Sequence, residues 1–255
     1  MLEHIVLFFA SVFAGGIDAI VGGGGLILIP ALFITFPQAE PAALVGTNKS
    51  AGVWGTIFSA TRYLKQVNVS YSVLLPASIA GIVGSIIGAL LLLGVPTEPL
   101  RVALPIILVL LLIYTTKNKD LGKVHSPKLA GTKETLVASV IGFVVGVYDG
   151  FFGPGTGSFI IFAFAKWLGY DFLYASVSAK VINSATNISA LVVFLSTGNI
   201  LWEYVVLLIV GNLVGAFFGT RLALKKGAGF VRIVFIVIVS ILIIRTTYDA
   251  IVLIG

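Results

Sequence analysis

Cysteine is absent from the 255-residue sequence, and charged side chains are scarce. The missing cysteine excludes disulfide bonds and thiolate metal sites, and it leaves the redox compartment open. Asp, Glu, Lys and Arg together make up 10% of the chain, whereas 58% is hydrophobic and the mean hydropathy is +1.12. Soluble domains carry about 25% charged and about 45–50% apolar residues. Polar side chains this few could not cover a soluble core, so lipid must surround most of the protein.

Acidic residues are fewer than basic ones, 10 against 16, which gives a net charge of +6. The basic residues lie in short segments between apolar runs. This placement is typical of the positive-inside bias of membrane proteins and not of a nucleic-acid surface. The N-terminal stretch lacks the basic segment and cleavage site of a signal peptide, so we expect it to be the first membrane segment.

Ten apolar runs divide the sequence. They fall at roughly 2–21, 26–36, 43–64, 71–95, 99–116, 135–152, 157–168, 174–197, 202–224 and 230–253. A helix that crosses a bilayer needs about 20 residues, and most of the runs reach that length. The runs 26–36 and 157–168 are too short, and each follows a glycine-rich break. The sequence therefore predicts an all-α integral membrane protein with two re-entrant or broken helices.

The two halves of the sequence repeat each other. A shift of 131 residues (149 − 18) places Asp18 on Asp149 and Lys49 on Lys180. The same shift superposes several further residues: Arg101 on Arg232, Gly15 on Gly146, Gly22 on Gly153, Gly24 on Gly155, Gly84 on Gly215, and Gly88 on Gly219. Rare charged residues at one constant offset indicate a duplication. We expect a first membrane repeat at 1–120, a cytoplasmic linker at 121–132 and a second repeat at 133–255.

The basic residues also predict how the two repeats are oriented. Arg62 and Lys65 mark the loop at the end of the third run, whereas the equivalent loop of the second half has no basic residue. Lys225 and Lys226 follow the ninth run, whereas the equivalent loop of the first half has none. Equivalent loops thus prefer opposite sides of the membrane. This pattern predicts an inverted 5+5 repeat with both termini outside the cytoplasm, in a multi-pass protein of the inner (plasma) membrane.

The first polar element inside the apolar runs is GGIDAIVGGGGLILIP (15–30), with its partner GVYDGFFGPGTGSFII (146–161). Each contains an acid, a glycine-rich break and then a new helix. The helices that begin near Gly24 and Gly155 would present free N–H donors and a positive end of about +0.5 charge. Two such ends near the bilayer midplane would form a cradle for an anion.

Glycine also permits tight helix packing, which is the simpler explanation of these residues. For the GxxxG pairs Gly84/Gly88 and Gly215/Gly219 we expect packing. The two breaks differ from these pairs because each lies beside an acid, and packing alone does not require an acid. We therefore interpret the breaks as functional loops.

The second polar element is GTNKSAGVWGT (46–56), with its partner VSAKVINSATN (177–187). Lys49 and Lys180 lie inside apolar runs, where a lysine at the helix centre costs about 2.5–3.5 kcal/mol. A role in ligand contact or gating would justify that cost. Two alternatives stay open, namely snorkelling to the interface and a structural salt bridge between each lysine and Asp18 or Asp149.

Asparagines and aspartates complete the polar set. Asn48, Asn183 and Asn187 add neutral donors, and the last two share one helix face because they are four residues apart. Asp18 and Asp149 have three interpretations: caps of the broken helices, proton carriers or charge partners of the lysines. A carboxylate is a poor direct ligand for an anion, which favours capping or proton coupling.

These motifs resemble those of a known family. GGIDAIVGGGGLILIPAL followed by TNKSAG, and GVYDGFFGPGTGSF followed by AKVINSATN, look like the signatures of the sulfite exporter TauE/SafE family, also called 4-toluene sulfonate uptake permeases. The resemblance covers essentially the whole chain and implies a secondary carrier of sulfite or organosulfonates. It places substrate binding on the following residues: Asp18, Gly22, Gly24, Asn48, Lys49, Asp149, Gly153, Gly155, Lys180, Asn183 and Asn187. Asn48 aligns with Ala179, so the two half-sites differ.

The sequence thus predicts a transporter of small anions that works by alternating access, not an enzyme, with no cofactor and no metal site. Its expected partners are a small anionic substrate and the lipid bilayer, without nucleic acid, and a homodimer is left open. One alternative is an anion channel, since pores also use half-helix ends. Another is an intramembrane aspartyl protease, but GGID at 15–18 does not match the required Gly-x-Gly-Asp motif.

Overall fold

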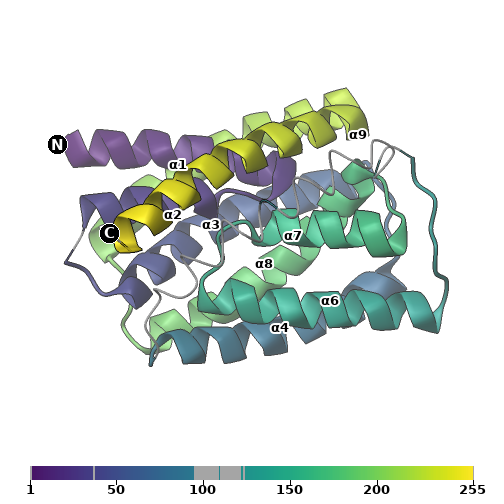
Figure 1. The fold of residues 1–255 in the computed structure, drawn as a ribbon, viewed down its shortest axis with the longest axis horizontal. Helices are drawn as coiled ribbons and strands as arrows, with labels where there is room; N and C mark the ends of the chain where they lie inside the picture. Colours follow the sequence, from purple (N-terminus) through teal and green to yellow (C-terminus); the bar gives the residue numbers. More distant parts are fainter. Residues whose placement is uncertain (1, 37, 95–108, 110–121, 123, 255) are drawn as a thin grey trace.

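A computed structural model describes residues 2–36, 38–94, 109, 122 and 124–254 (Figure 1). Its elements are α1 (Leu2–Val21), α2 (Gly25–Thr35), α3 (Pro41–Leu64), α4 (Tyr71–Leu92), α6 (Thr132–Phe151), α7 (Thr156–Ala163), the π-helix η1 (Phe164–Leu168), α8 (Phe172–Ser196) and α9 (Trp202–Ile254). The described residues include no strand, and five of their helices are long and apolar enough to cross a membrane. The predicted all-α membrane fold is confirmed. The run 99–116 lies outside the described residues.

Two short helices occur where the sequence predicts half-length segments. α2 has 11 residues, and α7 has 8 before it continues into η1. Each follows a glycine break: Gly22 has φ 74° after α1, and Gly153 has φ 91° after α6. Residues that carry a Cβ rarely adopt this left-handed backbone conformation, whereas glycine adopts it readily. The two glycines therefore allow the long helices to end at these points. Whether the short helices are re-entrant stays a prediction.

The long helices pack in pairs through their GxxxG glycines. α4 runs along α6, and the first part of α9 runs along α1. A Cβ added to Gly84 or Gly88 would lie 2.3 or 2.0 Å from a backbone oxygen of α6. A Cβ added to Gly215 or Gly219 would lie 1.9 or 2.4 Å from a backbone oxygen of α1. The predicted packing role of these glycines is confirmed.

The two predicted halves are interlocked. α4 of the first half packs on α6 of the second, while α9 of the second half packs on α1 of the first. α3 and α8 contact each other and lie between these two pairs (Figure 1). Each half therefore buries its helices mainly against the other half and is not a separate compact unit. The inverted orientation of the repeats stays a prediction.

Three basic segments that the structure describes lie at one end of the bundle: the turn after α3, the segment before α6 and the reversal within α9 (Figure 1). The start of α1 and the end of α9 lie at the opposite end, and α9 reverses direction at Gly227, where φ is 72° and ψ is −168° (Figure 1). The turn after α3 is held at the basic end by the Tyr174 hydroxyl, which accepts from Ser70 N–H at 2.9 Å. The grouping agrees with the loop charges that predict a cytoplasmic side, and the sidedness itself stays a prediction.

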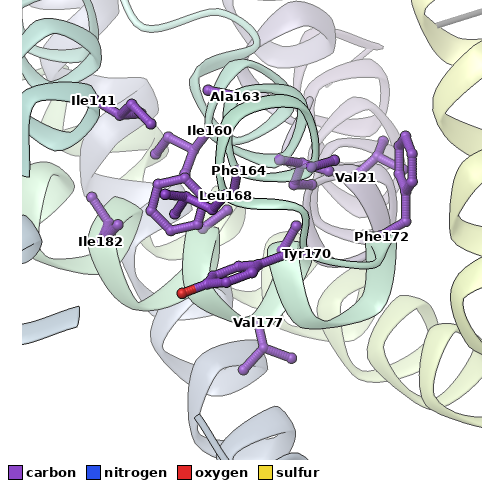
Figure 2. Close-up of a cluster of buried hydrophobic side chains, with 14 of the residues drawn as sticks. Val21, Ile141, Ile160, Ala163, Phe164, Leu168, Tyr170, Phe172, Val177 and Ile182 are labelled. Atoms are coloured by element: carbon purple, nitrogen blue, oxygen red, sulfur yellow. The ribbon is translucent and has the colours of Figure 1, made fainter. Parts of the chain in front are cut away.

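An apolar cluster holds α7, η1 and the start of α8 together (Figure 2). Phe164, Leu168 and Phe172 are fully buried in it. The segment before α6 is hydrogen-bonded to the turn between η1 and α8. The N–H groups of Ser126 and Lys128 donate to backbone oxygens of residues 168–169 at 2.9 Å. This packing fixes the short helix that follows the second glycine break.

Candidate functional site

A small cavity lies between the two glycine breaks and the middles of α3 and α8. Its volume is about 30 Å³, room for about two water molecules. The lining residues are Asp18, Gly22, Gly24, Gly25, Asn48, Lys49, Gly52, Thr56, Asp149, Gly153, Asn183, Asn187 and Asn212. All of the predicted site residues except Gly155 and Lys180 are among them. Sequence positions far apart in the chain thus converge on one polar cavity within the helices.

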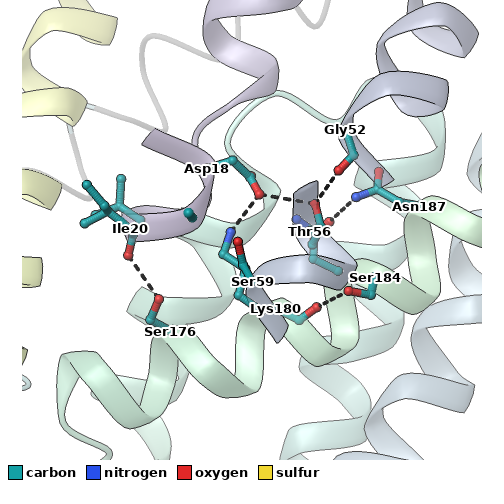
Figure 3. A network of polar contacts seen from close by, with 12 residues as sticks. Asp18, Ile20, Gly52, Thr56, Ser59, Ser176, Lys180, Ser184 and Asn187 are labelled. Carbon is teal, nitrogen blue, oxygen red and sulfur yellow. Dashed lines mark hydrogen bonds and ion pairs between the residues drawn. The ribbon is translucent and has the colours of Figure 1, made fainter. Parts of the chain in front are cut away.

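The lysines form two buried ion pairs that cross between the halves. Lys49 Nζ lies 2.6 Å from Asp149 Oδ1, and both side chains are 2% exposed. Lys180 Nζ lies 2.9 Å from Asp18 Oδ2, with side chains 0% and 14% exposed (Figure 3). The ion pairs that the salt-bridge alternative requires are therefore present, and a role of the lysines in ligand contact stays a prediction. The snorkelling alternative is wrong, because neither ammonium group reaches the surface.

The aspartates are charge partners and not helix caps. Besides a lysine, each accepts a hydrogen bond from one hydroxyl: Asp18 from Thr56 at 3.2 Å and Asp149 from Thr156 at 2.7 Å. Neither α2 nor α7 has a side-chain hydrogen bond at its N-cap, so the capping interpretation is wrong. Asp149 Oδ2 is buried and has no hydrogen-bond partner among the described residues. Such an unpaired oxygen is costly unless a ligand, water or proton satisfies it.

Hydroxyl groups stabilise the broken end of α1. The carbonyl oxygens of residues 19–21 accept hydrogen bonds from Tyr63 at 2.7 Å, Ser176 at 3.0 Å and Ser158 at 2.7 Å. Figure 3 shows the bond from Ser176. These last carbonyls of a helix have no partner within it, and water is scarce at bilayer depth. Side chains of α3, α7 and α8 thus allow α1 to end inside the protein.

The two glycine breaks touch each other. A Cβ at Gly22 would lie 2.3 Å from the Gly157 Cα, so no larger residue fits there without movement. Gly155 begins α7 with φ 79° and faces Leu26 of α2 instead of the cavity. Lys180 reaches the cavity only through its ion pair with Asp18. The starts of α2 and α7 are therefore brought together, as the anion-cradle hypothesis requires.

Amides supply the neutral donors of the cavity. Asn187 donates to the Oδ1 atom of Asn183 at 3.2 Å, so these two share a face of α8 as predicted. No described residue forms a hydrogen bond with the side chains of Asn48 or Asn212, although both line the cavity. Sequence reasoning missed Asn212, because its equivalent in the first half is Gly81. A polar residue inside the apolar run 202–224 was the signal that could have revealed it.

The charges around the cavity cancel. Lys49 and Lys180 contribute two positive charges, and Asp18 and Asp149 contribute two negative ones. An anion that entered would therefore add charge to a balanced site and would have to compete with a carboxylate for a lysine. In the described part of the chain, no group of three or more His, Cys, Asp or Glu side chains is placed to hold a metal ion.

Comparison with known proteins decides the family. The sulfite exporter TauE/SafE family matches residues 7–246, nearly the whole chain and both glycine breaks. The chain belongs to the TauE/SafE family.

Curated relatives of this TauE/SafE protein are named as transporters. It is 35% identical over 245 residues to the probable membrane transporter protein ORF9 of a Sinorhizobium species. The aligned stretch covers 95% of this chain and 92% of that relative. It is 35% identical over 246 residues to the probable membrane transporter protein YfcA of Escherichia coli K12, covering 96% and 90%. A probable membrane transporter protein of Haemophilus influenzae is 32% identical over 248 residues, covering 96% and 94%. No solved structure matches.

Family, relatives and structure agree on a coarse description. This TauE/SafE chain is a helical multi-pass membrane protein, and the names of its relatives support a membrane transporter. Those names fit the expectation that it is not an enzyme. They leave its cargo, its direction and the residues that bind the cargo to be argued from the cavity.

Proposed function

We propose that this protein is a secondary transporter that exports sulfite or organosulfonate-type anions by alternating access, with its substrate site in the cavity between the two glycine breaks. The observation that carries the proposal is the cavity itself, where the start of α2 and Gly153 of the second glycine break lie beside a buried lysine and several amides. Helix N-termini favour oxyanions, because their N–H groups and dipole face the ligand. The family name supports sulfite or related sulfur oxyanions as cargo.

In this proposal the substrate replaces a carboxylate at a lysine. Lys49 Nζ already holds one oxyanion, Asp149 Oδ1, at 2.6 Å and beside the second break. A sulfite or sulfonate oxygen has similar hydrogen-bonding chemistry and can take the place of that carboxylate oxygen. Asn48 and Asn212 line the same cavity, and no described residue forms a hydrogen bond with their side chains, so they would donate to the remaining oxygens. A proton on Asp149 would then balance the charge, which retains the proton-carrier hypothesis for the aspartates.

Alternating access is proposed from the duplicated sequence and the interlocked packing. The repeats at 1–120 and 133–255 would be inverted copies joined by the linker 121–132, and their crossed ion pairs lie between them. Inverted repeats of this kind rock about a central site in secondary transporters. The cavity of about 30 Å³ would then belong to a state closed around the site.

The decisive experiment measures radiolabelled sulfite counterflow in proteoliposomes. We expect Lys49→Ala and Lys180→Ala to abolish counterflow in the protein that purifies folded, although both variants should be less stable than the wild type. The control is Lys65→Ala, which removes an exposed lysine of the loop after α3 and should transport normally. Normal counterflow in both site variants would refute the lysine assignment.

The same assay distinguishes a carrier from a channel. A carrier saturates and exchanges labelled for unlabelled anion, whereas a channel conducts without exchange. Cargo is assigned separately by adding sulfite, sulfonates and carboxylates to purified protein and measuring thermal stabilisation. Stabilisation by carboxylates alone would exclude sulfur oxyanions as the preferred cargo.

A further inference from the structure

A second pocket lies at the basic end of the bundle, away from the central cavity. We call it the basic groove. It lies between the end of α3 and residues 217–225 of α9, and its volume is about 530 Å³, within the range of about 300–1,000 Å³ that is usual for small-molecule sites. Three cations line it, Arg62 from α3 and Arg221 and Lys225 from α9. Its lining contains no acidic residue.

The cations of the basic groove lack counter-charges. Their side chains are exposed, and no described residue forms an ion pair with Arg62, Arg221 or Lys225. Three like charges around one hollow create a positive potential that an anion would relieve. Two of them are guanidinium groups, whose planar fork suits the oxygens of a phosphate group.

Aromatic side chains form the deeper wall of the basic groove. Phe58 precedes Arg62 by four residues, and Phe217 precedes Arg221 by four. The backbone of each phenylalanine therefore lies about 6 Å further along the helix, toward the membrane interior, than that of its arginine. The guanidinium carbon of Arg62 lies 5.3 Å from the centre of the Phe58 ring. Phe217 is 39% exposed. The groove is thus basic at its outer end and apolar toward the membrane interior.

We propose that the basic groove binds an anionic phospholipid, with the phosphate at Arg62, Arg221 and Lys225 and an acyl chain along Phe58 and Phe217. Membrane topology requires basic residues at this end, but it requires neither a hollow between them nor an aromatic ring below each arginine. A lipid has this same order of charge and hydrocarbon, and anionic headgroups bind basic pockets between membrane helices. The proposal does not depend on which anion the protein transports.

Native mass spectrometry of the detergent-purified protein tests this proposal. The protein is titrated with dioleoyl phosphatidylglycerol or with dioleoyl phosphatidylcholine, which has the same acyl chains but no net charge. We expect a preference for phosphatidylglycerol that falls about tenfold in the double variant Arg62→Gln and Arg221→Gln. The matched control is Lys65→Gln and Lys226→Gln, which removes two exposed charges at the same end but outside the groove. This control should keep the preference.

Four outcomes would overturn the lipid site. The first is undiminished phosphatidylglycerol binding by the arginine variant, and the second is an equal loss in the lysine control, which would indicate surface charge alone. The third is displacement of the lipid by inorganic phosphate, which would assign the groove to a free anion. If the arginine variant does not fold, Lys225→Gln should show a smaller loss. A wild-type protein that binds both lipids equally would also refute the proposal.

Discussion

Lys49 and Asp149 form an ion pair that is buried in the protein. Both are 2% exposed, and their charged atoms are 2.6 Å apart. A buried ion pair of this kind stabilises a protein little more than two apolar side chains of similar size would. Removing one partner, however, leaves a buried unpaired charge, which lowers the free energy of unfolding strongly. The energetic role of the pair is therefore to make each of the two charges compatible with the interior.

The first prediction concerns this pair alone. Lys49→Met and Asp149→Asn should each lower the free energy of unfolding by about 3–5 kcal/mol, because each leaves one buried charge unpaired. The double variant should lose less than the sum of the two, since it leaves no charge unpaired. Urea unfolding in detergent measures all four proteins. Strictly additive losses would show that the two side chains do not interact.

The second prediction uses the unpaired lysine as a sensor of anions. In Asp149→Asn, Lys49 has lost the carboxylate at 2.6 Å, and an added anion can take its place. Sulfite should therefore raise the midpoint of thermal unfolding more in this variant than in the wild type. Lys49→Met is the control, because it offers no cation and should show a smaller shift. An equal shift in all three proteins would place the anion elsewhere.

The sequence predicts most of the site residues but not their pairing. Polar residues inside apolar runs stand out, and a constant offset relates Asp18 to Asp149 and Lys49 to Lys180. The offset is the same whether each lysine pairs with the aspartate of its own half or with that of the other half. Only the packing of the helices determines which aspartate the lysine contacts. Asn212 was missed because the duplication gives it a glycine as partner. Gly155 lies against Leu26 of α2 instead of the cavity, and this depends on how the two breaks pack.

At the scale of helices, the glycine pairs set how closely two backbones approach. At the α4–α6 and α1–α9 interfaces, the backbone of one helix occupies the space that a side chain would fill if the glycine of the other helix were a larger residue. The hydrophobic runs predict the helices well because length and apolarity alone determine a membrane span. They do not predict which helices pair, since nearly every face of such a helix is apolar and only the small residues mark a contact.

The third prediction tests this contact in α9. Gly215→Ala would place a Cβ 1.9 Å from the Val12 carbonyl oxygen, so α1 must shift, and overpacking costs about 1–3 kcal/mol or more. Gly229→Ala is the matched control, because it changes another helical glycine of α9 with nothing within 4 Å. Alanine there should be neutral or stabilising by up to about 1 kcal/mol. Thermal unfolding compares the two, and equal midpoints would contradict close packing at Gly215.

At the scale of the whole molecule, α3 and α9 connect the central cavity with the basic end. α3 contributes Lys49 and Thr56 to the cavity, and α9 contributes Asn212. Further along, the Thr220 hydroxyl donates to Ser59 Oγ at 2.9 Å and joins the two helices in the interior. If the proposed alternating access opens the site toward this end between α3 and α9, these two helices would have to separate.

The fourth prediction is that a covalent link between them stops transport. The chain has no cysteine of its own, so Ser59→Cys with Thr220→Cys introduces a single pair whose side-chain atoms are already adjacent. Oxidation should abolish sulfite counterflow, and reduction should restore it. Ser59→Cys alone should be insensitive to oxidant. Full counterflow in the oxidised double variant, with the disulfide verified by mass, would show that α3 and α9 do not move apart.

The crossed ion pairs also have a consequence for the order of events during synthesis. A ribosome completes Asp18 and Lys49 well before Lys180 and Asp149 exist, and N-terminal segments enter the membrane first. The first half must therefore wait in the bilayer or the insertion machinery without the partners that Asp18 and Lys49 have in the finished protein, and with α1 not yet covered by α9. Its assembly can finish only when the chain is nearly complete, so we expect a nascent chain stopped at the linker to be more open to membrane quality control than the finished protein.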